Sequence, residues 1–576
     1  MLNALSVSLS GDEAGRLRAA RSFEQQGFVP AARFDWAGGA LQAWGHPAQP
    51  DVPDCFVTSE AGTGCCIGPI WYRGRFGVQA LTLLLAEIDE PSMIDETRLR
   101  GNFALFLHKR GRAWLLNDAL GFVHLFRSGD GRFHSTSWLA ARAYVGDAGV
   151  DETAAVQYVL QGASHSTQTV ALGVTKLAPG HAIDLADGRA QSRFPMGIWA
   201  GAQTFTSPGA ATRAIEAHLG AVFADVVSAF PGRVSAALSG GFDSRLIVAG
   251  LLAHGERPRL FVYGNPASGD APVAREVAQA EGLPIEVVDK EAMNRQLPAP
   301  DLAELVRSAL FFDGLPNDGI DDPGADRRTR IEQTADGRIA LNGGGGEIFR
   351  NFFHLPDRRY GAGDLVRAFY RGFDAGVFRG RGGLADYESA MADAIAQSVG
   401  LDAGEAGRLL AREQVEWVYP LFRCHHWMGV NNSVAVRHGH FATPLVDLES
   451  TRIACMLPLE WKNAGRFESG LIAALHRGIA SGPSTYGFRF IDGPDLRARW
   501  NEWITCQRPA FVRPTINAVR RRLHGAGPSA ALVARCRSLL PGEWRLDPLL
   551  DLSRLPDDAA FGRALAIEVV SRELAP

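Results

Sequence analysis

A short polar turn at residues 239–244 carries the side chains best suited to chemistry in this chain, in the order Ser-Gly-Gly-Phe-Asp-Ser. An apolar run leads into the turn, and a helical pattern follows it. Backbone N–H groups at a helix N-terminus hold anions, and glycines let an anion approach the backbone closely. The two serines would add hydroxyl donors. This arrangement predicts a pyrophosphate cradle.

Asp243 is the one group in this turn that would repel a phosphate. The repulsion disappears when a divalent cation lies between the two, and Mg²⁺ typically bridges carboxylates to phosphate oxygens. We therefore predict that the turn binds phosphates together with Mg²⁺ and that Asp243 is a metal ligand. The turn differs from the common G-x-x-x-x-G-K-[ST] phosphate loop, because no lysine follows it. A plain turn with a serine cap is the alternative.

The surrounding pattern indicates the elements that would position this turn. From about residue 213, short apolar runs alternate with helical stretches, which is typical of βαβ units on a parallel sheet. We expect strands at residues 234–238, 260–263 and 285–288, and helices at 244–254 and 271–280.

Residues 1–195 have a different pattern, which favours packed antiparallel sheets. Glycine and aspartate separate short β-segments, for example 103–109, 113–118 and 180–185. A helix is expected at 151–163 with Asp151 as its N-cap, and the polar stretch 200–212 is expected to be a linker.

Composition narrows the class of protein. The chain has 576 residues and a net charge of -4, which gives no reason to expect nucleic acid or an anionic membrane as a partner. Its 7 cysteines are an odd number in a long chain, which argues against a disulfide framework. We find neither the basic segment of a signal peptide nor a run of about 18 apolar residues. We expect a cytoplasmic protein.

At residues 239–244 the sequence resembles the ATP pyrophosphatase (PP-loop) superfamily, whose signature is S-G-G-x-D-S. Members of this superfamily cleave ATP between the α- and β-phosphates and adenylate an acceptor oxygen. The resemblance implies ATP and Mg²⁺ as cofactors, with AMP and pyrophosphate as products. The expected cofactor-binding residues are Leu238, Ser239, Gly240, Gly241, Phe242, Asp243, Ser244, Tyr263, Asn342, Gly343 and Gly344.

Further motifs resemble the asparagine synthetase-like family. "LRGNFALFLHKRGRAWLLNDALGFVHLF" is similar to a segment of its amidotransferase domain, and "HHWMGVNNSVAVRHGHFATPLVD" is similar to its M-A-x-x-x-E-x-R-x-P-F-L-D motif. The resemblance covers about residues 100–490 and implies an α/β protein. Its parts would be an N-terminal Ntn-type (class II glutamine amidotransferase-like) αββα sandwich over 1–195, a Rossmann-like ATP pyrophosphatase domain over 213–525, and a C-terminal helical tail over 526–576.

The glutaminase motifs of that family are missing. Its nucleophile is a cysteine at the mature N-terminus, whereas Leu2 stands at position 2 here and the first cysteine is Cys55. We therefore expect the N-terminal domain to be an inactive scaffold. Similar losses occur in β-lactam synthetase, carbapenam synthetase and lasso-peptide cyclases, which attack the acyl-adenylate with an amine of the substrate itself.

"LNGGGGEIF" at residues 341–349 lies where the family has S-G-E-G-S-D-E-V-F. Aligned without a gap, Gly343 replaces the catalytic glutamate and Gly346 replaces the second Mg²⁺ ligand. With a gap of one residue, Glu347 takes the metal-ligand place. We prefer the gapped alignment, because a metal with a single protein carboxylate is less well held. A flexible glycine loop is the alternative.

The family's late catalytic lysine is also missing. The matching region, "SGPSTYGFRF" at residues 481–490, offers Arg489 or Tyr486 as substitutes, and an arginine could supply charge but not a proton. Lys462 lies nearby in the sequence and is expected to be a capping or surface residue.

A second group of residues invites a zinc interpretation. Its spacing fits no standard four-ligand site, so helix packing is the preferred role. The residues are Cys424, His425, His426, His438 and His440.

Together these motifs predict an ATP-dependent, AMP-forming carbon–nitrogen ligase. The preferred reaction is macrolactam formation on a precursor peptide, as in lasso-peptide cyclases, with a carboxylate of the peptide as substrate and a protease or leader-binding protein as partner. Three alternatives stay open. They are an asparagine synthetase that uses ammonia, a small-molecule synthetase of the β-lactam type, and a non-catalytic nucleotide-binding homologue.

Overall fold

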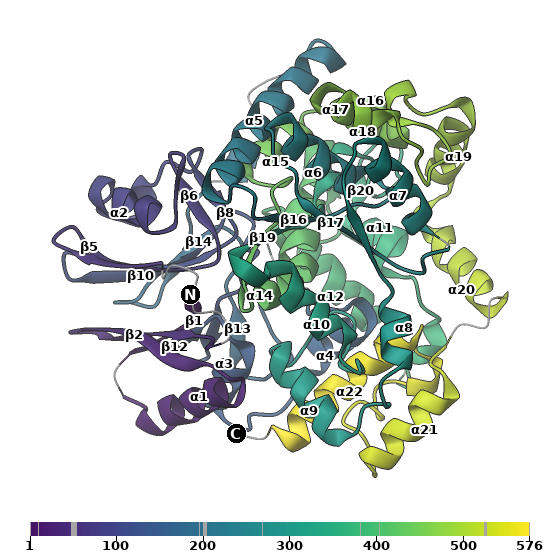
Figure 1. Ribbon diagram of the computed structural model, residues 1–576. Coiled ribbons are helices and arrows are strands. Elements are labelled where there is room, and N and C mark those ends of the chain that lie inside the picture. Colours follow the sequence, from purple (N-terminus) through teal and green to yellow (C-terminus); the bar gives the residue numbers. More distant parts are fainter. Residues whose placement is uncertain are drawn as a thin grey trace.

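The computed structural model describes residues 2–9, 11–47, 55–194, 196–199, 204–267, 269–380, 382–402, 404–523 and 527–574. Over these residues the chain is a mixed α/β protein. Antiparallel sheets form its N-terminal half and a parallel sheet lies in its C-terminal half (Figure 1). No helix in the described ranges is both long enough and apolar enough to cross a bilayer.

The N-terminal half contains two six-stranded antiparallel sheets. In spatial order the first consists of β13 (Val174–Lys176), β11 (Phe126–Ser128), β12 (Phe133–Ser135), β1 (Leu2–Leu9), β3 (Gly39–Gly45) and β2 (Val29–Trp36). The second consists of β15 (Ala190–Ser192), β14 (His181–Asp184), β10 (Arg112–Asn117), β9 (Ala104–Lys109), β5 (Gly62–Ile67) and β4 (Phe56–Ser59). A smaller sheet joins β7 (Arg75–Phe76), β6 (Ile70–Tyr72) and β8 (Leu99–Gly101).

Strand side chains alternate between two cores, because successive residues point to opposite faces of a sheet. In β9, Phe106 faces the core between the two sheets, whereas Leu105 and Leu107 face α2 (Gly77–Glu87). The helices α1 (Glu13–Gln25) and α3 (Trp138–Val145) cover the outer face of the first sheet. Figure 1 shows these layers in the order α2, second sheet, first sheet and α1. The αββα layering expected from the sequence is therefore present.

The five-stranded sheet of the C-terminal half is entirely parallel. In spatial order it consists of β18 (Ile285–Val288), β17 (Arg259–Tyr263), β16 (Val234–Ala237), β19 (Ile339–Leu341) and β22 (His440–Ala442). Two helices, α6 (Phe242–Ala253) and α7 (Asp270–Ala280), connect β16 to β17 and β17 to β18. These strands and helices confirm the predicted βαβ alternation to within two residues at the helix starts.

The strand order places the polar turn at a particular point of this sheet. From β16 the chain first builds outward through β17 and β18, and then returns to the other side of β16 with β19. In open parallel sheets, ligands bind beyond the carboxyl ends of strands where the order reverses in this way. Residues 239–244 follow β16 directly, so they lie at that position.

The helix that precedes the sheet begins earlier than expected. The helix α5 (Pro208–Ala229) is capped by Ser207, whose side chain accepts a hydrogen bond from the Ala210 N–H. The expected linker at 200–212 is therefore helical from residue 208, and residues 200–203 lie outside the described ranges. The expected helix after Asp151 is α4 (Glu152–Gln161), and Asp151 does cap it by accepting from the Ala154 N–H.

The remaining helices surround the parallel sheet and extend it. They are α8 (Lys290–Arg295), α9 (Leu302–Phe311), α10 (Ala325–Thr334), α11 (Ala362–Leu365), α12 (Gly383–Ser398), α13 (Arg412–Val418), α14 (Gly429–Val436), α15 (Leu448–Cys455), α16 (Leu459–Lys462), α17 (Arg466–Leu475), α18 (Arg477–Ser481), α19 (Leu496–Gln507), α20 (Arg513–Leu523), α21 (Ala530–Leu539) and α22 (Asp558–Glu573). Two short strands, β20 (Tyr360–Gly361) and β21 (Leu409–Leu410), pair separately.

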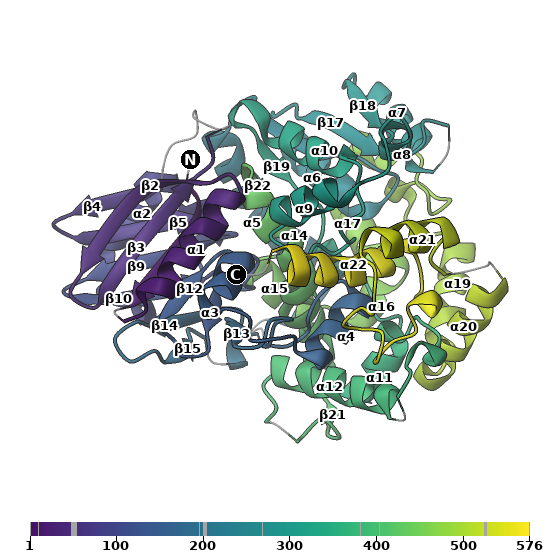
Figure 2. The same ribbon diagram turned by 90° about the horizontal axis from the view of Figure 1, so that it is seen from below.

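The C-terminal segment is part of the core rather than a detached tail. Most of α22 is buried against α4 and α9, and Arg563 donates hydrogen bonds of 2.8 Å to the carbonyls of Val159 and Asn317. Arg142 of α3 donates to the Leu574 carbonyl at 2.7 Å. Figure 2 shows the yellow helix α22 running toward the N-terminal half. The helices expected after residue 525 therefore join both halves, while residues 524–526 and 195, at the expected domain boundaries, are not described.

Two glycines allow a test of how tightly the helix after the turn is packed. A Cβ at Gly250 of α6 would lie 2.0 Å from Phe223 Cε2, whereas a Cβ at Gly470 of α17 would meet nothing within 4 Å. We expect Gly250→Ala to lower the free energy of unfolding by about 1–3 kcal/mol through overpacking. Gly470→Ala should raise it by about 0.5–1 kcal/mol, since alanine costs less entropy in a helix. Urea unfolding of both variants measures this, and equal effects would contradict the packing of α6.

Candidate functional site

The turn after β16 is folded by its own serines. The Ser244 hydroxyl oxygen accepts a hydrogen bond from the Ser239 N–H at 2.9 Å, and the Ser239 hydroxyl oxygen accepts one from the Gly241 N–H at 3.1 Å. The two hydroxyl oxygens lie 2.8 Å apart. Leu238 is buried and continues the pairing with β17. The hydroxyls expected as extra phosphate donors thus hold the turn in shape.

An acidic side chain lies on the turn where an anion was expected. The Gly240 N–H donates to Asp270 Oδ1 at 2.9 Å, and a Cβ at Gly240 would lie 2.3 Å from Thr485 Cγ2. Asp270 is the first residue of α7, so its carboxylate reaches across from the next βα connection. The turn therefore holds a negative charge in this structure, and that charge comes from the protein.

Residues 479–490 pack against the start of α6. Arg245 is buried and donates to the carbonyls of Ile479, Gly482 and Pro483. Phe242 packs its ring 4.4 Å from the Phe490 ring centroid and 4.5 Å from that of Tyr486. Phe242 is therefore a packing residue rather than an exposed ligand contact. Tyr486 is 47% exposed and lies beside the candidate site.

Next to the turn, three carboxylates from different segments surround one guanidinium. Both carboxylate oxygens of Asp243 lie 2.8 Å from an Arg350 Nη. Arg350 Nε lies 2.9 Å from Glu468 Oε2, and its Nη lies 3.8 Å from Glu347 Oε1. We call Asp243, Glu347, Glu468 and Arg350 the acid cluster. Its single positive charge leaves the ionised cluster with an excess of negative charge.

Burial makes this excess costly. Burial raises the pKa of the Asp243 carboxyl to about 6. The Arg350 charge opposes this rise, and the Glu347 charge adds to it. Burial, reinforced by the Asp243 charge, also raises the pKa of Glu468 well above its usual range. Glu468 is fully buried, and the positive group against it is Arg350, whose Nε lies 2.9 Å from its Oε2. Carboxylate oxygens are the ligands that Mg²⁺ prefers, so the donor types suit that ion. With Arg350 between them, the three carboxylates do not all come within 4.8 Å of one another in this structure.

The glycine run at residues 343–346 is a packed loop and not a flexible one. A Cβ at Gly343 would lie 3.0 Å from the Ser244 nitrogen, and one at Gly346 would lie 2.3 Å from Asp243 Oδ1. At Gly344 it would lie 2.4 Å from Met428 Cε. The loop therefore packs its backbone against the turn and the acid cluster, where a larger residue would require Asp243, Met428 or the turn backbone to shift.

Glu347 follows this loop and faces the other side of Arg350. Its Oε2 accepts hydrogen bonds from the Tyr419 hydroxyl at 2.5 Å and from the Gly345 N–H at 3.1 Å. Asn342 uses its side-chain oxygen to accept from the Gly344 N–H at 3.0 Å. The structure thus brings Glu347 into the cluster with Asp243, as the gapped alignment expects, although a guanidinium separates the two carboxylates.

Three residues singled out in the sequence lie elsewhere. Tyr263 turns toward α8 and α10, where its ring lies 4.1 Å from Lys290 Nζ, so it is not against the turn. Arg489 is exposed and bonds to Asp492 at 2.8 Å, so it does not replace the missing lysine in this structure. Lys462 is buried and paired with Glu416, not on the surface as expected.

The histidine group is a packing cluster. His425 bonds to the Gly121 carbonyl, His426 lies 2.9 Å from Lys176 Nζ, and His438 stacks on Phe311. Burial lowers the pKa of His425 to about 3 and that of Lys176 to about 7. All five cysteine and histidine side chains are buried, which agrees with the preferred role in packing.

Sequence reasoning missed Arg350, Glu468, Asp270 and Tyr419. Glu468 had a detectable signal, because it stands one turn before Ile472 on the apolar stripe of "RFESGLIAAL". An acid on a buried helix face needs a partner. Asp270 and Arg350 reach the site from other connections of the fold, and neither has a local sequence signal.

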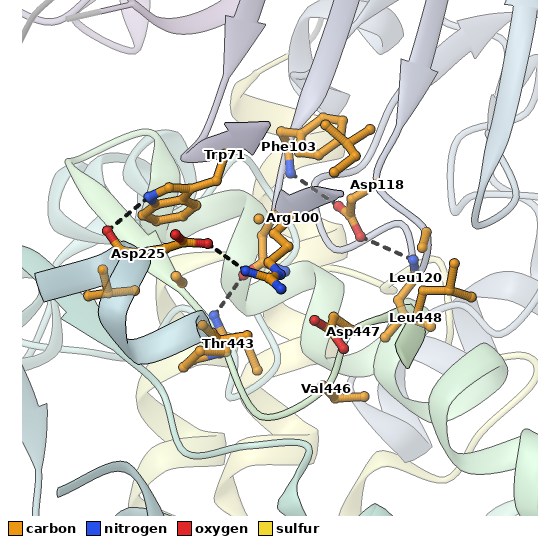
Figure 3. A pocket seen from close by; sticks show the side chains of 18 of the residues that line it. Trp71, Arg100, Phe103, Asp118, Leu120, Asp225, Thr443, Val446, Asp447 and Leu448 are labelled. Atoms are coloured by element: carbon orange, nitrogen blue, oxygen red, sulfur yellow. Dashed lines mark hydrogen bonds and ion pairs between the residues drawn. The ribbon is translucent and has the colours of Figure 1, made fainter. Parts of the chain in front are cut away.

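Outside the acid cluster, a cavity of about 50 Å³ lies where the N-terminal and C-terminal halves meet (Figure 3). Arg100 pairs with Asp225 at 2.5 Å, and Asn102 accepts from the Thr443 N–H at 2.7 Å. Asp118 accepts from the backbone N–H groups of Phe103, Leu120, Phe122 and Val123. The contacts Arg100–Asp225 and Asn102–Thr443 cross the joint, whereas the partners of Asp118 lie within the N-terminal half. A space of about 50 Å³ is large enough for a few water molecules. We regard it as a structural joint.

Comparisons with known proteins add little to this geometry. No protein-family model matches the chain, and no curated protein does. Among solved structures, glutamine phosphoribosylpyrophosphate amidotransferase from B. subtilis, complexed with ADP and GMP, is 10% identical, with 63% of this chain and 77% of that chain covered and a TM-score of 0.21. At that score the likeness establishes no shared fold.

Removal of the Arg350 guanidinium should show how much the buried carboxylates of the acid cluster destabilise the fold. We expect Arg350→Met to lower the free energy of unfolding by about 3–5 kcal/mol near pH 8, because it leaves buried carboxylates uncompensated. The loss of unfolding free energy should be smaller near pH 5. The pKa of Asp243 is raised to about 6 in the folded protein, so the folded state binds protons at pH 5 more readily than the unfolded state, and a protonated carboxyl needs no compensating charge. Denaturant unfolding at both pH values measures it, and the exposed Arg489→Met is the control. A loss independent of pH would show that Arg350 does not compensate these carboxylates.

Proposed function

We propose that the protein is an ATP-dependent, AMP-forming carbon–nitrogen ligase. One observation carries the proposal. The Ser-Gly-Gly-Phe-Asp-Ser turn lies at the reversal point of a parallel sheet, with its aspartate inside a cluster of three buried or half-buried carboxylates. The reversal point favours nucleotide binding, and the excess of carboxylates favours a divalent cation.

The residues of this site would divide the work as follows. The N–H groups of the turn would hold phosphate oxygens, once Asp270 leaves the Gly240 N–H. Asp243, with Glu347 or Glu468, would hold Mg²⁺, which when bound supplies charge stabilisation to the phosphates. A substrate carboxylate attacks the α-phosphorus and pyrophosphate leaves. An amine then attacks the acyl carbon, AMP leaves, and the amine loses a proton.

When Glu468 is the second metal ligand, Glu347 stays free of the metal, and we assign acceptance of that proton to Glu347. Its carboxylate is 29% exposed, and the hydrogen bond from the buried Tyr419 fixes its orientation. Tyr486 borders the same space and could orient the acyl group. No described lysine is free for this step near the cluster, since Lys462 is engaged by Glu416.

A large groove, which none of the four acid-cluster residues lines, supports a peptide substrate over a small one. It has a volume of about 1010 Å³ and is lined by Asn351, which follows Arg350 in the chain. Three tryptophans, Trp461, Trp500 and Trp503, and the guanidinium of Arg466 also line it. Ammonia or aspartate would leave most of this groove empty. We therefore favour macrolactam formation on a precursor peptide, with an acidic side chain of the peptide as the adenylated carboxylate.

One observation favours a second candidate. Because Arg350 spans both oxygens of Asp243, the protein already supplies a cation where Mg²⁺ is needed. A non-catalytic nucleotide-binding protein would have this property. Catalysis requires that the guanidinium yields at least one oxygen to the metal.

Exchange of labelled pyrophosphate into ATP separates these candidates. With a peptide carrying an acidic residue several positions from its N-terminus, wild-type protein should catalyse exchange and release AMP. Asp243→Asn should reduce exchange to background, and Asp492→Asn, which changes an exposed acid outside the cluster, should not. Exchange with aspartate and ammonium instead would favour an asparagine synthetase. Nucleotide binding without any exchange would overturn the ligase proposal.

The carboxylate on the turn yields a separate prediction. Asp270→Ala frees the Gly240 N–H and removes a charge that opposes phosphate, so the affinity for pyrophosphate should rise about tenfold, or about 1.4 kcal/mol. Glu291→Ala, which changes a 90% exposed acid on the neighbouring α8, should leave it unchanged. Isothermal titration calorimetry measures both. An unchanged or weaker affinity in Asp270→Ala would show that pyrophosphate does not use this turn.

A further inference from the structure

Outside the acid cluster, one group of side chains has the composition of a metal site. His354 Nδ1 lies 2.9 Å from Glu502 Oε1, and Cys506 Sγ lies 3.9 Å from the same oxygen. One potential ligand atom from each residue lies within 4.8 Å of the other two. No other group of three or more such residues meets this criterion in the part of the chain that the structure describes.

The fold holds these three ligands in a fixed geometry. Glu502 and Cys506 are four residues apart in α19, so they share one face of the helix. His354 comes from a different segment and has a φ of 48°, a left-handed conformation that is uncommon for histidine. Arg513 keeps that segment in place by donating to the carbonyls of Phe353 and His354 at 2.8 and 2.5 Å.

The sulfur of Cys506 lies between an amide donor and the Glu502 carboxylate. The sulfur is buried, and the Asn351 side-chain N–H donates to it at 3.5 Å. Asn351 is itself held by the Leu355 carbonyl at 3.1 Å and by Asn463 at 3.0 Å. An N–H donor aimed at sulfur stabilises negative charge there, and such outer contacts commonly orient the ligands of a bound metal. Burial and the Glu502 carboxylate raise the pKa of the Cys506 thiol to about 12, with Arg513 opposing the rise, so a bound metal would have to displace the thiol proton.

The ligand types select the metal. A thiolate, an imidazole and a carboxylate together suit Zn²⁺, whereas Mg²⁺ and Ca²⁺ take oxygen ligands alone. Sites with three protein ligands keep a fourth position for water or substrate. Glu502 and Cys506 line the groove of about 1010 Å³ that Asn351 also lines, so that fourth position would face the groove.

We propose that His354, Glu502 and Cys506 bind one Zn²⁺ ion, with its open position toward this groove. The ion would clamp α19 to the segment that carries Glu347 and Arg350, only a few residues before His354. It would also present a Lewis acid to whatever occupies the groove. The proposal stands on these contacts and does not depend on the proposed ligase activity.

Metal content of the full-length protein tests the proposal. Purified protein is incubated with Zn²⁺ alone, passed through gel filtration and analysed for bound zinc by mass spectrometry. We expect one zinc per chain. His354→Ala and Cys506→Ser should weaken binding by at least about 100-fold, since even second-shell changes cost up to that much. Cys55→Ser, which changes a partly exposed thiol outside the cluster, is the matched control and should keep the zinc.

Cobalt provides a spectroscopic readout of the same ligands. Co²⁺ bound to wild type should show a thiolate-to-metal charge-transfer band and intense visible bands of a tetrahedral site, and the charge-transfer band should vanish in Cys506→Ser. If that variant fails to fold by circular dichroism, Glu502→Gln, on a partly exposed face of α19, replaces it and should lose the tetrahedral spectrum. A wild type that retains no zinc, or a Cys506→Ser variant with an unchanged charge-transfer band, would overturn the proposal.

Discussion

The guanidinium of Arg350 lies among the carboxylates of Asp243, Glu347 and Glu468, which come from the start of α6, the loop after β19 and the buried face of α17. These segments are far apart in the sequence, and their mutual charge would drive them apart without a cation between them. Arg350 also lies 5.3 Å from the Phe242 ring, so the same guanidinium touches the aromatic packing of the turn. The position of the turn, of the glycine loop and of α17 all depend on this one contact group.

The sequence predicted the regular architecture well because alternation and turns are local properties. The strands at 285–288 and 234–238, and the helix capped by Asp151, follow from periodicity and a capping residue, and the structure contains them. The site was predicted only where its residues are contiguous, in the turn and the glycine run. Asp270 and Arg350 reach it from neighbouring connections, and no local pattern marks a long-range pairing of charges.

The incorrect assignments have a common physical origin. Arg489 was chosen because lysine was missing from one short region, and Lys462 was expected at the surface, but packing decides where each side chain points. The Arg489 guanidinium is satisfied three residues away on the surface, and Lys462 is buried against Glu416. Tyr263 ends a strand at the correct edge of the sheet, yet its ring turns toward α8 and α10. The position of a residue along a strand determines at which edge of the sheet it lies. The direction of its side chain depends on the packing around it.

The close approach of Gly346 to Asp243 also constrains how this protein can change over evolution. Because a Cβ at Gly346 would lie 2.3 Å from Asp243 Oδ1, a side chain at that position requires the aspartate to shift. The aspartate would have to move first, and its contact with Arg350 opposes that movement. A larger residue at position 346 would therefore be tolerated best together with a change that releases Asp243 from Arg350.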